Sequence, residues 1–264
     1  MRAIDLNCDM GEMPEALADG SQETLMRFVS SANIACGGHA GNAEMMRETV
    51  EQALRCGVTI GAHPGYADPD NFGRRELQLS PEEISNSIHR QVIALNEVGE
   101  RYGATIVHVK AHGALYNQAA RSREIARAIA DGVRHWRGDV VMVGLTGSVM
   151  INEFRAAGFV AAAEAFADRR YEGDGCLRSR KFADALLQDP KEAAEQALRI
   201  VTERIVIATD GSRIPVEADT ICIHSDTPGA AEIAAAVRGL LNEKGIEVKP
   251  LGIRRLSRNE KPES

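Results

Sequence analysis

A chain of 264 residues with 44% hydrophobic, 26% charged and 4% aromatic residues has the composition of an ordinary soluble protein, long enough to bury a large core as one domain. Its net charge of −7 and few aromatic side chains argue against a nucleic-acid-binding protein, which needs a basic face and stacking rings. No stretch approaches the roughly 18 consecutive apolar residues of a membrane span, and residues 1–5 contain no signal-peptide core.

Short apolar and β-branched runs predict seven strands, each followed by a polar loop and a helix. The predicted strands cover residues 3–8, 32–36, 58–62, 105–107, 140–144, 159–164 and 219–223. The predicted helices cover residues 22–30, 43–56, 81–102, 121–136, 149–157, 190–202 and 229–241. Residues 204–207 and 214–216, joined by Asp210-Gly211, predict a small β-hairpin.

Capping signals mark several of the predicted helix ends. Ser21 and Asn42 are typical N-caps, and Gly57 is a typical C-terminal glycine. Ser80 and Glu83 form a capping box, with Pro81 at the first helical position.

The regular alternation of strands and helices predicts a parallel sheet covered by helices. Seven short strands favour a single-domain distorted seven-stranded (β/α) barrel, and a doubly wound open sheet is the alternative. We assign residues 1–252 to this α/β barrel domain and residues 253–264 to a charged C-terminal tail.

Reactive side chains gather where the predicted strands end. They are Asn7, Asp9, Glu12, His39, His63, Lys110, His112, Glu164, Asp168, Arg169, His224 and Asp226. In a parallel barrel these strand ends meet on one rim, where active sites of such folds are built. Each residue alone has a structural explanation, such as a helix cap or a hydrogen bond to a backbone carbonyl. Their joint placement, which includes five of the seven histidines when His108 is counted, predicts an enzyme.

Two further patterns limit the chemistry and the compartment. The chain has neither a Gly-x-x-x-x-Gly-Lys-Ser/Thr motif nor a Gly-x-Gly-x-x-Gly motif after a strand, so a nucleotide site of either type is not expected. Its five cysteines are scattered and include no Cys-x-x-Cys pair. Reduced thiols in the cytoplasm are therefore expected, and Cys8 and Cys36 are expected to be packing residues.

The strand-end motifs resemble those of the LamB/YcsF family over about residues 3–252. The motifs are residues 5–12 (DLNCDMGE), 33–41 (NIACGGHAG), 61–66 (GAHPGY), 112–117 (HGALYN), 165–169 (AFADR) and 224–229 (HSDTPG). The resemblance implies a barrel like that of glycoside hydrolases and polysaccharide deacetylases. It also implies a role as the A subunit of a bacterial 5-oxoprolinase, which converts 5-oxo-L-proline and water to L-glutamate with ATP hydrolysis, together with subunits B and C.

The resemblance suggests roles for the strand-end residues. Lys110 would stabilise phosphoryl or oxyanion charge, and Asp9 or His112 would be the general base. Arg74 and Arg169 would hold the substrate carboxylate. The other candidate substrate-binding residues are Asn7, Glu12, His39, His63, Tyr116, Asn117, Asp168, His224 and Asp226.

Two other functions remain open at this level. Asp9, His63 and His112 could hold a divalent metal, which would suit a metal-dependent deacetylase or amidohydrolase, although they lack a local metal-binding spacing. The chain could also be a non-catalytic subunit that binds a lactam or a sugar.

Overall fold

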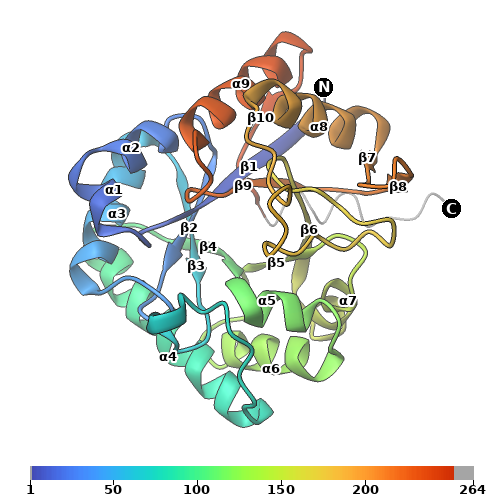
Figure 1. The fold of residues 1–264 in the computed structure, drawn as a ribbon. Helices are drawn as coiled ribbons and strands as arrows, with labels where there is room; N and C mark the ends of the chain where they lie inside the picture. The colour runs from blue at the N-terminus through green and yellow to red at the C-terminus, as the bar shows by residue number, and fades with distance from the viewer. Residues whose placement is uncertain (1, 253–264) are drawn as a thin grey trace, which may run out of the picture.

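The computed structural model describes residues 2–252, and its centre is a closed barrel of parallel strands (Figure 1). The seven barrel strands are β1 (Ala3–Met10), β2 (Ser31–Ala35), β3 (Thr59–His63), β4 (Ile106–Lys110), β5 (Val141–Leu145), β6 (Val160–Phe166) and β9 (Thr220–Ile223). Each pairs with the next in this order, and β9 pairs with β1. The predicted barrel is confirmed, and the open-sheet alternative is wrong because β9 pairs with both β6 and β1, which closes the sheet.

Helices surround this barrel on its outer side (Figure 1). They are α1 (Pro14–Ala18), α2 (Ser21–Met26), α3 (Ala43–Cys56), α4 (Pro81–Arg101), α5 (Gly113–Ala119), α6 (Arg123–Arg134), α7 (Val149–Ala156), α8 (Pro190–Glu203) and α9 (Ala230–Glu243), with a 3₁₀ turn η1 (Pro69–Asn71). The predicted hairpin is present as β7 (Ile205–Ile207) and β8 (Arg213–Pro215). No helix within residues 2–252 is both long and apolar enough to cross a bilayer.

Most of the capping predictions are confirmed. The Asn42 side chain accepts hydrogen bonds from the amides of residues 44 and 45, and Gly57 ends α3 in the left-handed conformation. Ser80 and Glu83 form the reciprocal capping box of α4. The prediction for Ser21 is wrong, because Gly20 occupies the N-cap with a φ of 76° that a residue without Cβ adopts freely.

Several element boundaries also differ from the sequence-based expectation. The predicted helix 22–30 ends at Met26, and the predicted helix 121–136 starts after a Ser122 cap. Helices α1 and α5 were not predicted, nor was β10 (Glu247–Val248), which adds two residues beside the start of β1. These elements are too short to carry a hydrophobic period. The predicted tail 253–264 lies outside the described residues.

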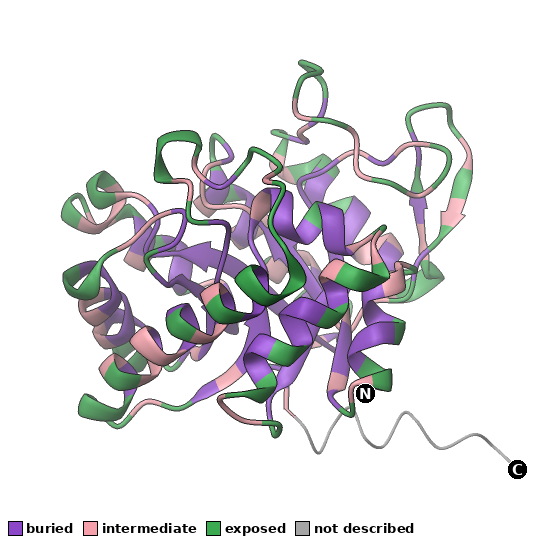
Figure 2. Ribbon diagram, turned by 90° about the horizontal axis from the view of Figure 1, so that it is seen from below, coloured by how far each residue is buried: buried purple, intermediate pink, exposed green. Residues whose placement is uncertain are grey.

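The hydrophobic core lies between the barrel and the helices (Figure 2). The purple, buried residues fill the strands and the inner helix faces, and the green, exposed residues lie on the outer faces. A small second cluster of Val141, Val143, Ala162 and Leu251 packs separately from that layer. Val141 and Val143 are registered with His108 and Lys110 on β4, so they share the inward face of the sheet.

Gly61 on β3 makes room for a histidine inside the barrel. The strand pairing between β3 and β4 shifts register at Ile60/Gly61, and Gly61 lies opposite His108. A Cβ atom at Gly61 would overlap the imidazole ring of His108, which is fully buried. The absence of a side chain at Gly61 is therefore required by the packing of His108.

We expect Gly61→Ala to lower the free energy of unfolding by about 2 kcal/mol or more, because the buried ring has no free space to move into. The matched control is Gly239→Ala in α9, where a Cβ atom meets no neighbour. That change should stabilise the protein by about 0.5–1 kcal/mol. Chemical denaturation of both variants measures the difference, and equal stabilities would contradict the packing argument.

Candidate functional site

The inside of the barrel carries polar side chains, which is unusual for buried strands. Alternate residues of a strand face the same side, so β1 turns Asp5, Asn7 and Asp9 inward together. The inward-facing polar residues of the other strands are Ser31, Asn33, His63, His108, Lys110, Glu164, Thr220 and Cys222. Because buried polar groups are costly unless paired, their hydrogen bonds decide the arrangement.

Lys110, at the end of β4, is the cation at the centre of this interior. Its Nζ lies 2.9 Å from Asp9 Oδ1 and 3.0 Å from Glu164 Oε1. Nζ also donates to Asn7 Oδ1 at 3.3 Å and to Cys222 Sγ at 3.1 Å. Although burial opposes the charged form, the neighbouring carboxylates hold the pKa of Lys110 well above its ordinary value. Lys110 is therefore a fixed ammonium ion and not a nucleophilic amine.

Two asparagine amides connect the carboxylates to one another. Asn7 Nδ2 donates to Glu164 Oε1 at 3.0 Å, and Asn33 Nδ2 donates to Asp9 Oδ1 at 2.8 Å. Asn33 Nδ2 also donates to Asn7 Oδ1, and His108 Nε2 donates to Asn33 Oδ1 at 2.7 Å. This chain of bonds fixes the orientation of each amide and the tautomer of His108.

Three imidazoles surround the carboxylate of Glu12 on the rim. Glu12 Oε1 lies 2.8 Å from His39 Nε2, 3.2 Å from His112 Nδ1 and 3.7 Å from His63 Nε2. His63 Nε2 is also 3.3 Å from Asp9 Oδ2. Burial favours a neutral carboxyl, but the neighbouring imidazoles of His112 and His39 hold the pKa of Glu12 well below its ordinary value. Burial lowers the pKa of His39 to about 4, so that ring is neutral at physiological pH.

The loop between β3 and α4 covers this histidine cluster. The ring of Phe72 meets both His39 and His112 edge to face, and the Phe72 carbonyl accepts from His112 Nε2 at 2.9 Å. Phe72 has a φ of 52°, an uncommon conformation for a non-glycine residue that aims this carbonyl at the ring. A Cβ atom at Gly73 would lie 2.6 Å from His39 Cβ, so the loop approaches closely only because glycine is present.

A histidine–aspartate pair forms a separate part of the rim, between β6 and β9. His224 Nδ1 lies 3.0 Å from Asp168 Oδ1, and the hydroxyl of Thr227 donates to Asp168 Oδ2 at 2.6 Å. Burial would raise the pKa of Asp168, but His224 and Thr227 lower it to about 2. The His224 ring also stacks on Phe166 with a centroid separation of 5.2 Å. Because Nδ1 donates to Asp168, Nε2 is the nitrogen that carries the lone pair in the neutral ring.

The arginines of the rim differ in their partners. Arg74 and Arg180 both form ion pairs with Asp226. Arg169 is buried and donates to the carbonyl of residue 178, and its Nε has no hydrogen-bond partner among the described residues. Of these three arginines, Arg169 is therefore the one without an ion-pair partner among the described residues.

A cavity of about 850 Å³ opens above these groups. Its lining includes eleven of the predicted site residues, namely Asp9, Glu12, His63, Arg74, Lys110, His112, Tyr116, Asn117, Arg169, His224 and Asp226. The other three lie directly behind: Asn7 below Lys110, His39 behind Glu12, and Asp168 behind His224. The structure thus brings all fourteen residues together around one cavity, and their roles in catalysis and binding stay predictions.

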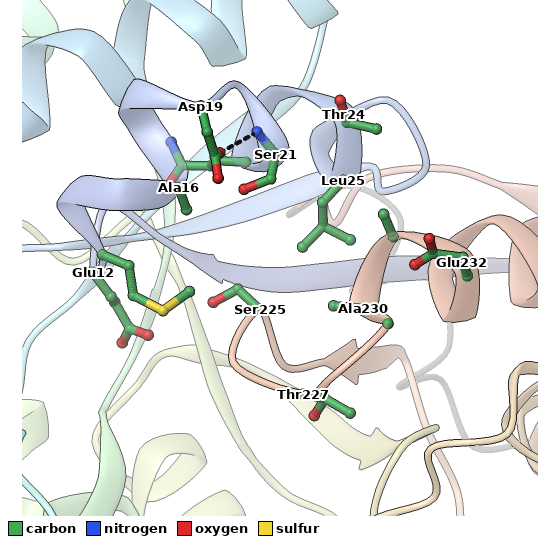
Figure 3. A pocket seen from close by; sticks show the side chains of 14 residues that line it. Glu12, Ala16, Asp19, Ser21, Thr24, Leu25, Ser225, Thr227, Ala230 and Glu232 are labelled. Carbon is green, nitrogen blue, oxygen red and sulfur yellow. Dashed lines mark hydrogen bonds between the residues drawn. The ribbon is translucent and has the colours of Figure 1, made fainter.

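A second cavity of about 480 Å³ lies between α1, α2 and the start of α9 (Figure 3). Glu12 and Ser225 line both cavities. Figure 3 shows Glu12 on one side of this space, with Leu25 and Ala230 on the other sides. Glu12 is therefore part of the wall between the two cavities.

The site also contains residues outside the fourteen candidates that the sequence suggested for catalysis and binding. These are Asp5, Asn33, His108, Glu164, Cys222, Phe72 and Phe166. The polar residues among them lie on strands, at positions two residues apart from other inward-facing residues of the same strand. This alternation is visible in the sequence of β1 as Asp5-x-Asn7-x-Asp9. The two phenylalanines gave no such signal, because their role depends on which rings they meet.

The sequence of this chain is similar to a family model and to several named proteins. The model of the LamB/YcsF family matches residues 4–255. A protein from Chloroflexus aggregans, named as the A subunit of 5-oxoprolinase, is 49% identical over 94% of this chain and 99% of its own length. The protein of the same name from Staphylococcus carnosus is 43% identical over 94% of this chain and 99% of its own length.

Solved structures give the same relationship. The crystal structure of a lactam utilization protein from Thermus thermophilus has a TM-score of 0.88 and 44% identity, and the match covers 94% of this chain and all of that one. A family 4 carbohydrate esterase from Streptomyces lividans has a TM-score of 0.51 and 12% identity, with 94% and 91% of the two chains covered. This second likeness shows a shared barrel fold alone.

The buried His108 predicts a specific pH dependence of stability. Burial, followed by the charge of Lys110, lowers the pKa of His108 to about 3, whereas the unfolded value is about 6.5. The contribution of the neutral His108 ring to the free energy of unfolding is fully present above pH 6.5 and is lost as the pH falls toward 3. The free energy of unfolding should therefore fall by about 2 kcal/mol between pH 7 and pH 5. His108→Gln keeps a donor to Asn33 and should remove this loss, whereas His135→Gln at an exposed position should not. Denaturant titrations at both pH values measure it, and equal pH slopes for His108→Gln and the wild type would contradict the assignment.

Proposed function

Because the chain belongs to the LamB/YcsF family, we propose that it is the A subunit of an ATP-dependent 5-oxoprolinase. In this proposal it works with subunits B and C, converts 5-oxo-L-proline to L-glutamate, and couples the ring opening to hydrolysis of ATP to ADP and phosphate. The observation that supports it most directly is the 49% identity, over nearly the full length of both chains, to a protein named as the A subunit of 5-oxoprolinase.

The coupling to ATP follows from the chemistry of the substrate. An unstrained five-membered lactam is a weak electrophile, so phosphorylation of its oxygen would activate the ring carbon toward water. Collapse of the tetrahedral adduct would break the ring C–N bond, with the nitrogen protonated as it leaves, and would give an acyl phosphate whose hydrolysis releases phosphate and L-glutamate. Both the phosphoryl group and the oxyanion formed on attack carry negative charge. Lys110 offers a buried ammonium ion next to the cavity, where such charge is stabilised far more strongly than in water.

His224 is the general base in this proposal, in place of Asp9 or His112. The Asp9 carboxylate accepts a hydrogen bond from Lys110. Burial raises the pKa of Asp9, but His63 and Lys110 lower it by more, so the pKa is held well below its ordinary value. His112 Nδ1 points into the Glu12 cluster. By contrast, His224 lines the cavity and is oriented by Asp168 through Nδ1, so its Nε2 can accept the proton of the attacking water.

Arg169 is assigned to the carboxylate of 5-oxo-L-proline. It lines the cavity, is buried, and has no ion-pair partner within the described part of the chain. A guanidinium in this state binds a carboxylate in a bidentate manner. Arg74, which the sequence also suggested, is already paired with Asp226, so its proposed role is to hold the rim together.

The proposal is tested by reconstitution of this chain with subunits B and C. The complete mixture should release glutamate and ADP in equal amounts when 5-oxo-L-proline and ATP are present, and mixtures lacking this chain should release neither. Lys110→Met should lower the glutamate rate by about 100-fold or more, because the transition state loses its charge partner. Full activity without this chain, or unchanged turnover of Lys110→Met, would refute the proposal.

The roles of the rim residues predict distinct kinetic changes in the reconstituted complex. His224→Asn should lower kcat by about 100-fold or more with little change in KM. Asp168→Asn should also lower kcat, but by a smaller factor, because Asp168 acts only by orienting His224. Arg169→Lys should instead raise KM for 5-oxo-L-proline about 10-fold or more. His135→Gln, at the exposed end of α6, is the control, and a loss of kcat in all four variants would indicate a general structural effect.

A further inference from the structure

We propose that Glu12 Oε1, His63 Nε2 and His112 Nδ1 bind one divalent transition-metal ion of the zinc or manganese class at the rim of the barrel. The three atoms belong to a group of ligand atoms that all lie within 4.8 Å of one another. This inference goes beyond the lactam-opening function, and it holds or fails on metal content alone.

The hydrogen bonds of the two histidines leave bare nitrogens facing each other. His63 Nδ1 lies 2.8 Å from the carbonyl oxygen of Lys110, and His112 Nε2 lies 2.9 Å from that of Phe72. A carbonyl oxygen can only accept a hydrogen bond, so His63 Nδ1 and His112 Nε2 are the nitrogens that carry the ring protons. In the neutral rings, His63 Nε2 and His112 Nδ1 are then both lone-pair acceptors, and they are 3.0 Å apart. A cation between them removes the repulsion.

The separations of the ligand atoms match those around a small metal ion. Bonds of about 2.0–2.1 Å in a tetrahedral site place ligand atoms about 3.3 Å apart. The separations here are 3.0 Å between His63 Nε2 and His112 Nδ1, 3.2 Å from His112 Nδ1 to Glu12 Oε1, and 3.7 Å from His63 Nε2 to Glu12 Oε1. The two rings are inclined at 88°, so one point can lie in the plane of both.

His39 is excluded from the ligand set by its ring orientation. Its ring is parallel to that of His112, with an interplanar angle of 1° and a centroid separation of 3.6 Å. An ion bound in the plane of one ring therefore lies well outside the plane of the other. His39 Nε2 instead donates to Glu12 Oε1 at 2.8 Å, which makes it a positioning residue for the carboxylate.

The backbone carbonyls give each ligand histidine the outer support that metal sites use. Metal-bound imidazoles usually donate their second N–H to a carbonyl or carboxylate, which fixes the ring and its tautomer. Both His63 and His112 have this bond. The donor set of two imidazoles and one carboxylate suits zinc, and the large cavity on the same side leaves a position for an oxygen ligand.

A neighbouring group of potential ligands does not compete. Asp9, Cys222 and His224 also lie close together. The Lys110 ammonium already donates to Asp9 Oδ1 and to Cys222 Sγ, so a fixed cation occupies the position that a metal ion would need. The Glu12 group has no lysine or arginine among its ion-pair partners in residues 2–252.

The test uses the full, tag-free chain after chelator treatment and dialysis. Titration with Zn²⁺, Mn²⁺ and Co²⁺ by calorimetry, with metal analysis after gel filtration, should give one ion per chain for at least one of them. Glu12→Gln and His112→Gln should weaken binding at least 100-fold. His39→Gln should keep one ion per chain with about 10- to 100-fold weaker binding, as for loss of an outer-shell partner. His135→Gln should bind as the wild type does.

Two outcomes would overturn the proposal. The first is the absence of saturable binding of any of the three ions by the folded wild-type chain, which would mean that a proton occupies the space between the two nitrogens. The second is unchanged binding by Glu12→Gln and His112→Gln. The absorption spectrum of the Co²⁺-loaded wild type is independent of variant folding. Nitrogen and oxygen ligands give visible ligand-field bands alone, whereas a thiolate charge-transfer band in the near ultraviolet would place the ion at a cysteine and overturn the proposed ligand set.

Discussion

The structure depends on the burial of one ammonium ion among carboxylates inside a seven-stranded barrel. Lys110 Nζ contacts Asp9 and Glu164 at about equal distances, 2.9 and 3.0 Å. Removing one partner would leave a buried charge uncompensated, which costs several kcal/mol. The asparagine amides that bridge the carboxylates therefore form one unit with the lysine, and this unit fixes the inward side chains of β1, β2, β4 and β6.

Asp9 connects this unit to the histidine cluster. Its Oδ1 accepts from Lys110, and its Oδ2 lies 3.3 Å from His63 Nε2. A change of charge on the histidines therefore alters the electrostatic environment of Lys110 through the single carboxylate of Asp9. Charges at these short distances interact strongly inside a protein. His224 lines the same cavity, and the His224–Asp168 pair is held by its own bonds to Thr227 and the backbone. The rim thus combines a buried ammonium ion, three imidazoles around one carboxylate, and a histidine oriented by an aspartate.

Local sequence signals predicted the elements well where a repeat or a cap was present. The Ser80–Glu83 capping box and the Asn42 cap fixed two helix starts, because these motifs satisfy backbone groups within one turn. The prediction failed at α5, in the middle of the His112–Asn117 motif, because seven residues carry too few apolar positions to show a helical period. The assignment of Arg74 to an anionic ligand was weakened by Asp226, which lies 152 residues away in the chain.

The sequence by itself determined the alternation of strands and helices and the collection of reactive residues at strand ends, because periodicity and strand polarity are local properties. Tertiary structure decided which of these residues touch. Only barrel closure brings Asn7 and Thr220 together, and the ring of His108 fits only because Gly61 on the neighbouring strand has no side chain. The tautomers of His63 and His112 follow from carbonyls of distant segments, at Lys110 and Phe72. Such contacts depend on packing between elements, which no window of sequence contains.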